Sequence, residues 1–392
     1  MKKPIRTTVK LDKIVPGGHA IGTLDSGLKV FVWGGLPGET VEIDITKRKS
    51  HYAEASVVRV LGNTSPDRVT PQDSCYLSTS PWQIMTKAAE IRYKTQLVVD
   101  IFRQHQLELE PQTIQGNSKF YYYRNKMEYS LWYDHDTAKI HPAFHRRGSH
   151  QKVMINSSSI ERPEIWAEAT RIINELNQAG EEARHFQSLL IRCDQTGRVS
   201  SGLFRMNQPH PDMQTLHDKI LGYDYTYSPN GFFQINLPVY EMALKAMQPW
   251  INTDHVVDMY AGVGTIGLSV ARDRKLTLVE TNPFACAEMR KNIPAGHDNI
   301  KPVEAKSEDA LNFITGDSTI IVDPPRVGLD TKVVARLNEV TPPTIIYLSC
   351  NPTTQARDVS ALADKYQIVY NQPFNFFPRT PHIENLIVLR AI

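Results

Sequence analysis

One cysteine of the sequence stands where a thiol could act as a nucleophile. Cys350 ends the apolar run TIIYLS and precedes Asn351-Pro352, so a strand should deliver its side chain to a sheet edge. The thiolate is the reactive form and requires a lowered pKa, which the amino end of a helix starting near Thr353 could supply. A buried structural thiol is the alternative, and it is the better interpretation of Cys193 and Cys286, which lie inside apolar runs.

A glycine-rich turn indicates a site for a nucleoside. Asp258 lies in the apolar run HVVDMY, and Gly262, Gly264 and Gly267 follow with G-x-G-x-x-G spacing. The glycines permit a tight turn and a close approach of a ligand to the backbone. Glu280 ends the next apolar run, where its carboxylate can accept hydrogen bonds from ribose hydroxyls. The turn alone does not distinguish a dinucleotide from S-adenosylmethionine, and a turn without any ligand is the plain structural alternative.

Two further motifs carry acid–base groups. The sequence Asp323-Pro324-Pro325-Arg326 follows an apolar run, and the chain must leave the sheet there because proline cannot continue a central strand. Ligands of open α/β sheets bind outside the carboxyl ends of the strands, which places Asp323 and Arg326 at that crevice. His382 and Glu384 precede the last apolar run, and a carboxylate there could serve as a general base. A stiffened loop and ordinary surface residues are the alternatives.

The segment that must position these groups is residues 228–392. Apolar runs such as HVVDMY, KLTLVE, STIIVD and TIIYLSC alternate there with helical patterns. Repeated β–α units with continuously apolar strands predict an α/β domain with a doubly wound parallel sheet. The glycine turn, Asp323 and Cys350 are therefore expected at one sheet edge.

Two of the preceding segments, residues 1–62 and 96–227, contain candidate contacts for nucleic acid. Residues 1–62 show short alternating strands between glycine turns, which predicts a small closed barrel, and they hold ten Lys or Arg against six Asp or Glu. The hairpin Lys47-Arg48-Lys49, with His51 and Tyr52 close behind, suits a phosphate backbone and a stacked base, although a solvated turn is the alternative. Residues 63–95 are interpreted as a linker and a helix that packs on the catalytic domain.

Residues 96–227 have a mixed pattern, which predicts a central α+β domain. Arg124 and Lys126 lie in the run YYYRNK, and Arg146 lies in FHRR; each run mixes aromatic and cationic side chains. These three residues are candidate RNA contacts, and a strand with a wet face is the alternative.

The composition sets outer limits on the class of protein. The chain has 392 residues, 41% hydrophobic and 22% charged, as in soluble globular proteins. Its net charge of +2 neither indicates nor excludes nucleic-acid binding, because such binding depends on a local patch of positive charge. No apolar run approaches the length that spans a bilayer, and no apolar stretch follows MKKPIRTTVK as in a secretory signal. A cytoplasmic monomer is expected.

Taken together, the motifs resemble the RNA uracil-5 methyltransferase family, which modifies tRNA or large-subunit rRNA. Residues 1–62 resemble a TRAM domain through VPGGHAIGTLD and VVRVL, and Asp-Pro-Pro-Arg with Ser-Cys-Asn-Pro is the family's signature pair. The resemblance implies a Rossmann-like class I methyltransferase domain over residues 228–392, an OB-like TRAM barrel and a central RNA-binding domain. It implies S-adenosylmethionine as cofactor and RNA as partner, with 23S rRNA favoured over tRNA.

The resemblance also implies roles for individual residues. Cys350 would attack C6 of a uracil extruded from the RNA, C5 would take the methyl group, and Glu384 would remove the C5 proton before the thiol leaves. Arg326 and His382 would contact RNA. The cofactor would be held by Gln234, Tyr260, Gly262, Thr265, Glu280 and Asp323, and Thr265 stands where some relatives have asparagine.

One departure from the family and three alternatives complete the interpretation. Many relatives carry four cysteines around a [4Fe–4S] cluster before the first long helix; that stretch holds Cys75 alone here, so no cluster or other metal site is predicted. An RNA cytosine-5 methyltransferase would place Pro-Cys where this chain has Asp-Pro-Pro-Arg. An NAD enzyme would leave Cys350 and Glu384 unexplained. An RNA-binding or RNA-folding protein with weak or lost catalysis is the alternative from another class, and the intact Cys350 and Glu384 argue against it.

Overall fold

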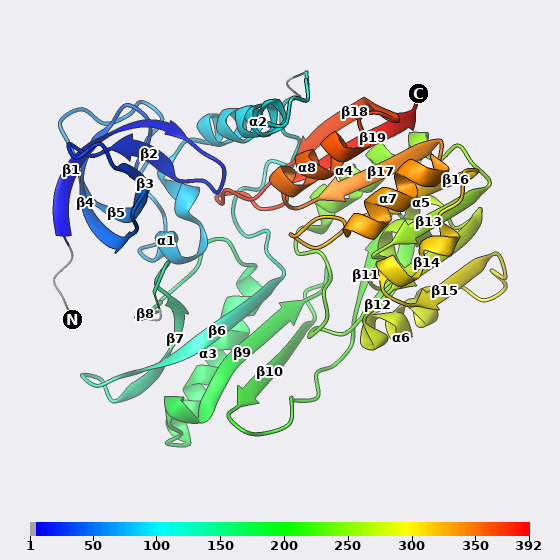
Figure 1. Ribbon diagram of the computed structural model, residues 1–392. Helices are drawn as coiled ribbons and strands as arrows, with labels where there is room; N and C mark the ends of the chain where they lie inside the picture. Colours follow the sequence, from blue (N-terminus) through cyan, green and yellow to red (C-terminus); the bar gives the residue numbers. More distant parts are fainter. Residues whose placement is uncertain (1–4, 111, 150) are drawn as a thin grey trace.

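The computed structural model describes residues 5–110, 112–149 and 151–392, and its elements form three groups (Figure 1). A closed five-stranded barrel lies at one side, a seven-stranded sheet lies at the other, and a five-stranded sheet lies beneath both in this view. The first four residues of the expected barrel segment are outside the described residues. Within the described ranges, none of the helices combines the length and the apolar character needed to cross a bilayer.

The barrel follows from the alternation of apolar and polar residues in its five strands. Its strand order is β1-β2-β3-β5-β4, and valines of β3 and β4 such as Val30, Val32 and Val41 point inward and are fully buried. The strands are β1 (Ile5–Ile14), β2 (Ala20–Thr23), β3 (Lys29–Trp33), β4 (Thr40–Arg48) and β5 (Tyr52–Leu61). The predicted barrel is therefore present.

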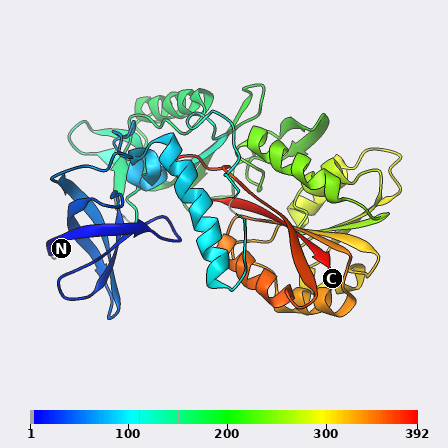
Figure 2. The same ribbon diagram turned by 90° about the horizontal axis from the view of Figure 1, so that it is seen from above.

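A helical connection joins the barrel to the rest of the chain. It consists of α1 (Tyr76–Thr79), a 3-10 turn (Pro81–Ile84) and the long helix α2 (Lys87–Gln104). The hydroxyl of Thr86 caps α2 by accepting a hydrogen bond from the Ala89 N–H at 3.1 Å. Figure 2 shows α2 between the barrel and the seven-stranded sheet. The boundary expected between residues 95 and 96 falls inside this helix.

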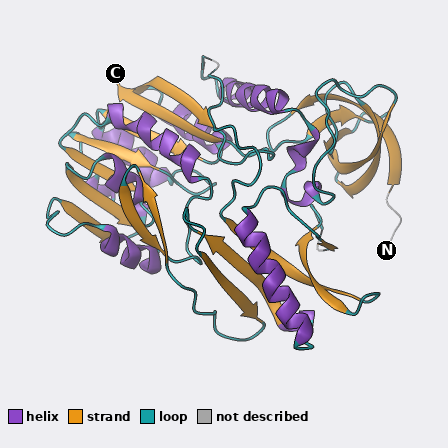
Figure 3. Cartoon of the chain, turned by 180° about the vertical axis from the view of Figure 1, so that it is seen from behind, coloured by secondary structure: helices purple, strands orange, loops and turns teal. Residues whose placement is uncertain are grey.

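The central sheet is antiparallel, and one helix covers one of its faces (Figure 3). Apolar residues of α3 at helical spacing, including Ile165, Ala169 and Ile173, pack on it. The strand order of this sheet is β10-β9-β6-β7-β8. Along the chain, its elements are β6 (Lys126–Asp134), β7 (Lys139–His145), β8 (Lys152–Met154), α3 (Pro163–Gln178), a 3-10 turn (Ala183–His185), β9 (Phe186–Cys193) and β10 (Val199–Arg205).

A two-stranded hairpin, β11 (Leu216–Ile220) with β12 (Tyr223–Tyr227), follows the central sheet. Its residues were expected in the central domain, yet Leu216, Ile220 and Tyr225 pack in the core of the seven-stranded sheet. The hairpin therefore packs with the seven-stranded sheet and contributes to the apolar core on one of its faces. The division into four domains stays a prediction.

The seven-stranded sheet has the order β15-β14-β13-β16-β17-β19-β18. Its strands are β13 (His255–Met259), β14 (Lys275–Glu280), β15 (Ile300–Glu304), β16 (Ser318–Val322), β17 (Thr344–Ser349), β18 (Tyr366–Phe374) and β19 (Glu384–Ala391). Its helices are α4 (Leu237–Met247), α5 (Thr265–Val270), α6 (Pro283–Asn292), α7 (Thr331–Val340) and α8 (Pro352–Leu362), with 3-10 turns at Gln248–Trp250, Ser307–Asp309 and Leu311–Phe313.

Two apolar cores cover this sheet, one on each face. Residues of α2, α7 and α8 pack on the face that carries Val257 and Ile345, and residues of α4, α5 and α6 pack on the face that carries Val256 and Ile346. The predicted Rossmann-like α/β fold is confirmed. The sheet is not wholly parallel, because β19 runs antiparallel to both β17 and β18. The start of β19 consequently lies at the edge where the parallel strands end.

Candidate active site

Strand register brings the predicted reactive residues to one edge of the seven-stranded sheet. Met259 pairs with Val322, and Val322 pairs with Tyr347, so these parallel strands end side by side. Tyr260, Asp323 and Cys350 each directly follow one of these three strands. The parallel strands therefore deliver the Asp323 carboxyl and the Cys350 thiol to a common crevice at this edge, whereas the Tyr260 hydroxyl lies beside Ser307 and Asp330.

The antiparallel strand adds a second carboxyl to this crevice. Leu348 pairs with Leu386 and Ser349 pairs with Asn385, so one further step of the register sets Cys350 opposite Glu384. Opposed residues of an antiparallel pair have Cβ atoms about 5 Å apart and side chains on the same face. Glu384 is 3% exposed, whereas Cys350 is partly exposed. A partly exposed cysteine and a buried acid therefore lie side by side.

Burial and like charge raise the pKa values of the groups in the crevice. Burial, together with the Glu384 and Asp323 carboxylates, raises the pKa of the Cys350 thiol to about 12, while the Arg326 guanidinium acts in the opposite direction. Burial and Asp323 raise the pKa of Glu384 well above its usual range, and burial raises the pKa of Asp323 to about 7. The sequence-based expectation of a lowered thiol pKa is wrong for the free protein, because the thiol is largely buried and two acids from distant segments face it.

The glycine turn is held by the two acids that flank it. The Gly262 N–H donates to Glu280 Oε2 at 2.9 Å, and the Gly267 N–H donates to Asp258 Oδ2 at 2.8 Å. A Cβ on Gly267 would lie 2.5 Å from Leu278 Cδ2, so glycine is required there for helix–sheet packing. Gly262 has a φ of 58°, and a Cβ on it would meet no atom within 4 Å. The turn therefore leaves open space in front of its backbone.

The loop before Glu384 is fixed by buried charges of α2, which sequence reasoning missed. Lys94 Nζ donates to Asn375 Oδ1 at 2.6 Å and to the Phe377 carbonyl at 3.1 Å, and it lies 3.1 Å from Glu90 Oε1. The Glu90 carboxylate accepts the Arg379 N–H at 3.0 and 3.1 Å. Lys94 and Glu90 side chains are both 0% exposed. In the sequence they have the spacing of an ordinary surface ion pair, so no signal marks them.

The segment with Gln234 is held by the central sheet. Arg192 Nη2 donates to the Phe233 and Gln234 carbonyls at 2.7 and 3.1 Å, and Asn125 Nδ2 donates to the Gln234 carbonyl at 3.2 Å. Lys126 Nζ donates to the Gly231 carbonyl at 3.2 Å, and burial lowers its pKa to about 8. Lys126, which was a candidate RNA contact, thus holds this segment and is not a free surface charge.

Another residue missed from the sequence is Tyr240, near the amino end of α4. It is 3% exposed, and burial together with Asp323, Asp258 and Glu384 raises its pKa well above the usual value. Its hydroxyl thus lies among the acids of the crevice. Thr265, the first residue of α5, is also buried.

The predicted RNA contacts separate into two groups. In the first group, Arg326 Nη2 lies 3.4 Å from His382 Nδ1 beside the crevice. Burial lowers the pKa of His382 to about 3, and the nearby cations Arg326, Lys94, Arg147 and Arg124 act in the same direction. Arg124 therefore lies near the crevice, as does Arg147, which was not predicted. The second group, Lys47, Arg48, Lys49 and Arg146, is exposed, and Lys47 pairs with Glu54 at 2.9 Å.

Cys75 lies in a compact hydrogen-bonded region. It is 7% exposed, and burial raises its pKa to about 11. Nearby, Gln83 Nε2 donates to Asp73 Oδ2 at 2.7 Å, and the Ser159 hydroxyl donates to the same oxygen at 2.9 Å. Across residues 5–110, 112–149 and 151–392, no three His, Cys, Asp or Glu side chains gather as metal ligands. The expectation of a chain without a cluster stays a prediction.

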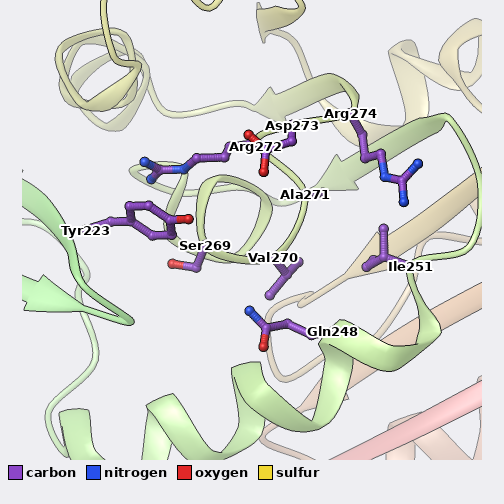
Figure 4. A pocket seen from close by; sticks show the side chains of 9 residues that line it. All are labelled: Tyr223, Gln248, Ile251, Ser269, Val270, Ala271, Arg272, Asp273 and Arg274. Atoms are coloured by element: carbon purple, nitrogen blue, oxygen red, sulfur yellow. The ribbon is translucent and has the colours of Figure 1, made fainter.

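A separate cavity of about 340 Å³ lies at the opposite edge of the seven-stranded sheet (Figure 4). Its lining includes Ile251 before β13 and Arg274 before β14, at the amino ends of these strands. Tyr223 and Arg272 also line it, with the guanidinium carbon 3.1 Å from the ring centroid. None of the predicted site residues lines this cavity.

Comparison with known proteins finds similarity to RNA-modifying enzymes. Residues 309–392 match the model of the family described as tRNA (uracil-5-)-methyltransferase, and residues 6–58 match the TRAM domain. A Bacillus cereus protein described as an uncharacterized RNA methyltransferase is 29% identical over 97% of this chain and 96% of its own. An Enterococcus faecalis protein with the same description is 28% identical over 99% and 98%.

A solved structure shares the whole fold. The crystal structure of Pyrococcus abyssi tRNA (uracil-54, C5)-methyltransferase in complex with S-adenosyl-L-homocysteine has a TM-score of 0.76 and 23% identity, covering 98% of this chain and 100% of that chain. The chain thus shares a Rossmann-like α/β fold with that structure, and its N-terminal barrel is similar to the TRAM domain. The model matches at residues 309–392 and 6–58 and the relatives described as RNA methyltransferases confirm the resemblance to RNA uracil-5 methyltransferases that was drawn from the motifs.

Proposed function

We propose that the protein transfers a methyl group from S-adenosylmethionine to C5 of a uridine in RNA, with Cys350 as nucleophile and Glu384 as proton acceptor. The observation that carries this proposal is the strand register that sets Cys350 opposite Glu384, with Asp323 at the same sheet edge. A nucleophile and a base on the same side of the crevice suit addition to C6 and proton removal from C5.

The glycine turn fits a nucleoside-type methyl donor. Space is open in front of Gly262, the partly exposed Glu280 carboxylate can accept ribose hydroxyls, and Asp258 Oδ1 is buried without a partner among the described residues. When bound, S-adenosylmethionine would supply a methyl group on a sulfonium sulfur. The residues that would hold it are Gln234, Tyr260, Gly262, Thr265, Glu280 and Asp323.

The residues of the chain perform the remaining steps. The Cys350 thiol gives its proton to water, and the resulting thiolate forms a bond to C6 of the extruded uracil, which converts C5 into the nucleophilic carbon of an enolate. Once C5 carries the methyl group, the Glu384 carboxylate takes the C5 proton. The C5–C6 double bond then re-forms as the C6–S bond breaks and releases the thiolate. Glu384 must be ionised for this step, so its high pKa in the free protein has to fall in the complex.

The substrate is an RNA that presents an extruded uridine. The sequence favours 23S rRNA, because TRAM domains are common in rRNA-modifying members, and we keep this as the first candidate. A tRNA is the second candidate, favoured by the description of the family that matches residues 309–392. Mapping 5-methyluridine in 23S rRNA and tRNA from cells with and without the gene decides between them. A cytoplasmic location and a monomeric state stay predictions.

The mechanism is tested with 23S rRNA fragments and tRNA that contain 5-fluorouridine, which has no C5 proton to remove. With S-adenosylmethionine, wild type should form a covalent complex that survives denaturing electrophoresis, and Cys350→Ala should form none. A covalent complex in Cys350→Ala would overturn the nucleophile. Glu384→Gln should accumulate the methylated adduct on normal RNA and lose about 100-fold or more in turnover. Unchanged turnover would remove Glu384 from the mechanism.

A further inference from the structure

The outer face of the barrel carries a row of aromatic rings. The alternate valines of β3 point into the barrel, so the aromatic residues between and after them point outward. Ring centroids of Phe31 and Tyr52 lie 5.7 Å apart, those of Phe31 and His19 lie 5.9 Å apart, and those of His19 and Trp33 lie 4.0 Å apart. These four partly exposed rings form a continuous row, called the aromatic track below: Tyr52, Phe31, His19 and Trp33.

One end of the aromatic track meets the loop of residues 375–383, which precedes β19 and is called the catalytic loop below. The Trp82 indole N–H donates to the Gly18 carbonyl, beside His19, at 3.0 Å. Gly18 packs so tightly on Pro381 that a Cβ there would lie 2.1 Å from the proline Cβ. Pro381 precedes His382, and Figure 1 shows the red loop before β19 reaching toward the barrel. The other end of the track begins at Tyr52, directly after the basic hairpin at residues 47–51.

Charge along the aromatic track suits a polyanion with flat bases. The Arg147 guanidinium lies 4.4 Å from the Trp33 ring centroid at the catalytic end, and the basic hairpin lies at the other end. Glu54, which pairs with Phe31 across the strands, is neutralised by Lys47 at 2.9 Å. Burial lowers the pKa of His19 to about 4, so its ring is neutral at pH 7. Neutral rings between cationic ends match stacked bases and the phosphates that join them.

We propose that the aromatic track binds the unpaired nucleotides next to the target uridine and leads them from the basic hairpin to the catalytic loop. This inference rests on the proposed RNA substrate and names the part of that RNA which the barrel recognises. Bases inside a duplex are covered by their neighbours, so stacking on the track selects loops, bulges and single-stranded ends. Stacking is tolerant of base identity, so the track distinguishes unpaired from paired nucleotides. Recognition of the RNA sequence then depends on other contacts.

The test uses a fluorescein-labelled single-stranded RNA of about 12 nucleotides, a length within the range of single-strand sites on related barrels. It carries adenosines around one central uridine, and a second version has abasic sites on either side of that uridine. Fluorescence anisotropy should show that wild type binds the intact RNA about tenfold or more tightly than the abasic RNA. Phe31→Ala should remove most of this ratio, and Phe31→Tyr should retain it.

A matched control and a second variant exclude general damage. Phe284→Ala removes an 85% exposed ring from α6, outside the barrel, and should leave the ratio at the wild-type value. Tyr52→Ala should lower the ratio as Phe31→Ala does, although it lies on another strand. An equal ratio of affinities for intact and abasic RNA in wild type, Phe31→Ala and Tyr52→Ala would overturn the proposal that the track binds bases. Failure of the proposed reaction would instead abolish the 5-fluorouridine complex of wild type while the anisotropy ratio persists.

Discussion

At the scale of single residues, the Cys350 thiol carries its proton in the free protein at neutral pH. Its pKa is raised to about 12 by burial and by two neighbouring carboxyls. We therefore expect slow alkylation by iodoacetamide, with a rate that rises about tenfold per pH unit between pH 7 and 9 without a plateau. Peptide mass spectrometry measures the rate at this residue, and Cys350→Ala supplies the background. A plateau below pH 8 would mean that the free thiol already has a depressed pKa.

The position of Cys350 could be predicted from the sequence, but the protonation state of the thiol could not. An apolar run that ends in Cys-Asn-Pro is a local pattern, and it places the side chain at a sheet edge. The acids that raise the thiol pKa come from β19 and from the loop after β16, so only the folded register brings them together. The glycine turn was predictable for the same local reason, since Glu280 follows it at the end of the next strand.

At the scale of elements, α2 fixes the loop that carries the proton acceptor. Lys94 is fully buried and binds Asn375, Phe377 and Glu90. Lys94→Met should cost about 3–5 kcal/mol of unfolding free energy, because it leaves the buried Glu90 carboxylate with Arg379 alone, at 3.5 Å, and removes the donor to Asn375 Oδ1. It should also slow proton removal from C5, so methylated adduct accumulates as in Glu384→Gln. Urea unfolding and quantification of the adduct on denaturing gels measure the two effects.

The control for this prediction lies on the same helix. Arg103 is 62% exposed and 3.6 Å from Asp100, so Arg103→Met should cost less than about 1 kcal/mol and leave the adduct unchanged. If Lys94→Met is destabilised but shows no excess adduct, Lys94 contributes to stability alone. Sequence analysis could predict the helix from its apolar spacing. It could not separate Glu90–Lys94 from an ordinary surface pair, because their burial depends on residues 375–379, far along the chain.

At the scale of the whole molecule, the barrel touches the catalytic loop. The sequence predicted the barrel and the α/β domain separately, since each arises from its own local alternation of apolar residues. It gave no sign of their contact, which depends on Gly18 meeting Pro381 and on Trp82 binding the Gly18 carbonyl. The antiparallel direction of β19, which brings Glu384 to the reactive edge, is likewise a property of the assembled sheet.

Gly18→Ala tests whether this contact matters for catalysis, and Gly27→Ala is its matched control. Both glycines have positive φ, of 87° and 80°, so alanine costs about 1–2 kcal/mol of backbone strain at either position. A Cβ meets no atom within 4 Å at Gly27 but would lie 2.1 Å from Pro381 at Gly18. Gly18→Ala must therefore displace the catalytic loop from the barrel. Its turnover should fall by up to about 100-fold while calorimetric binding of S-adenosylmethionine is unchanged, whereas Gly27→Ala should keep its turnover. Equal turnover in the two variants would show that the barrel holds RNA without positioning the catalytic loop.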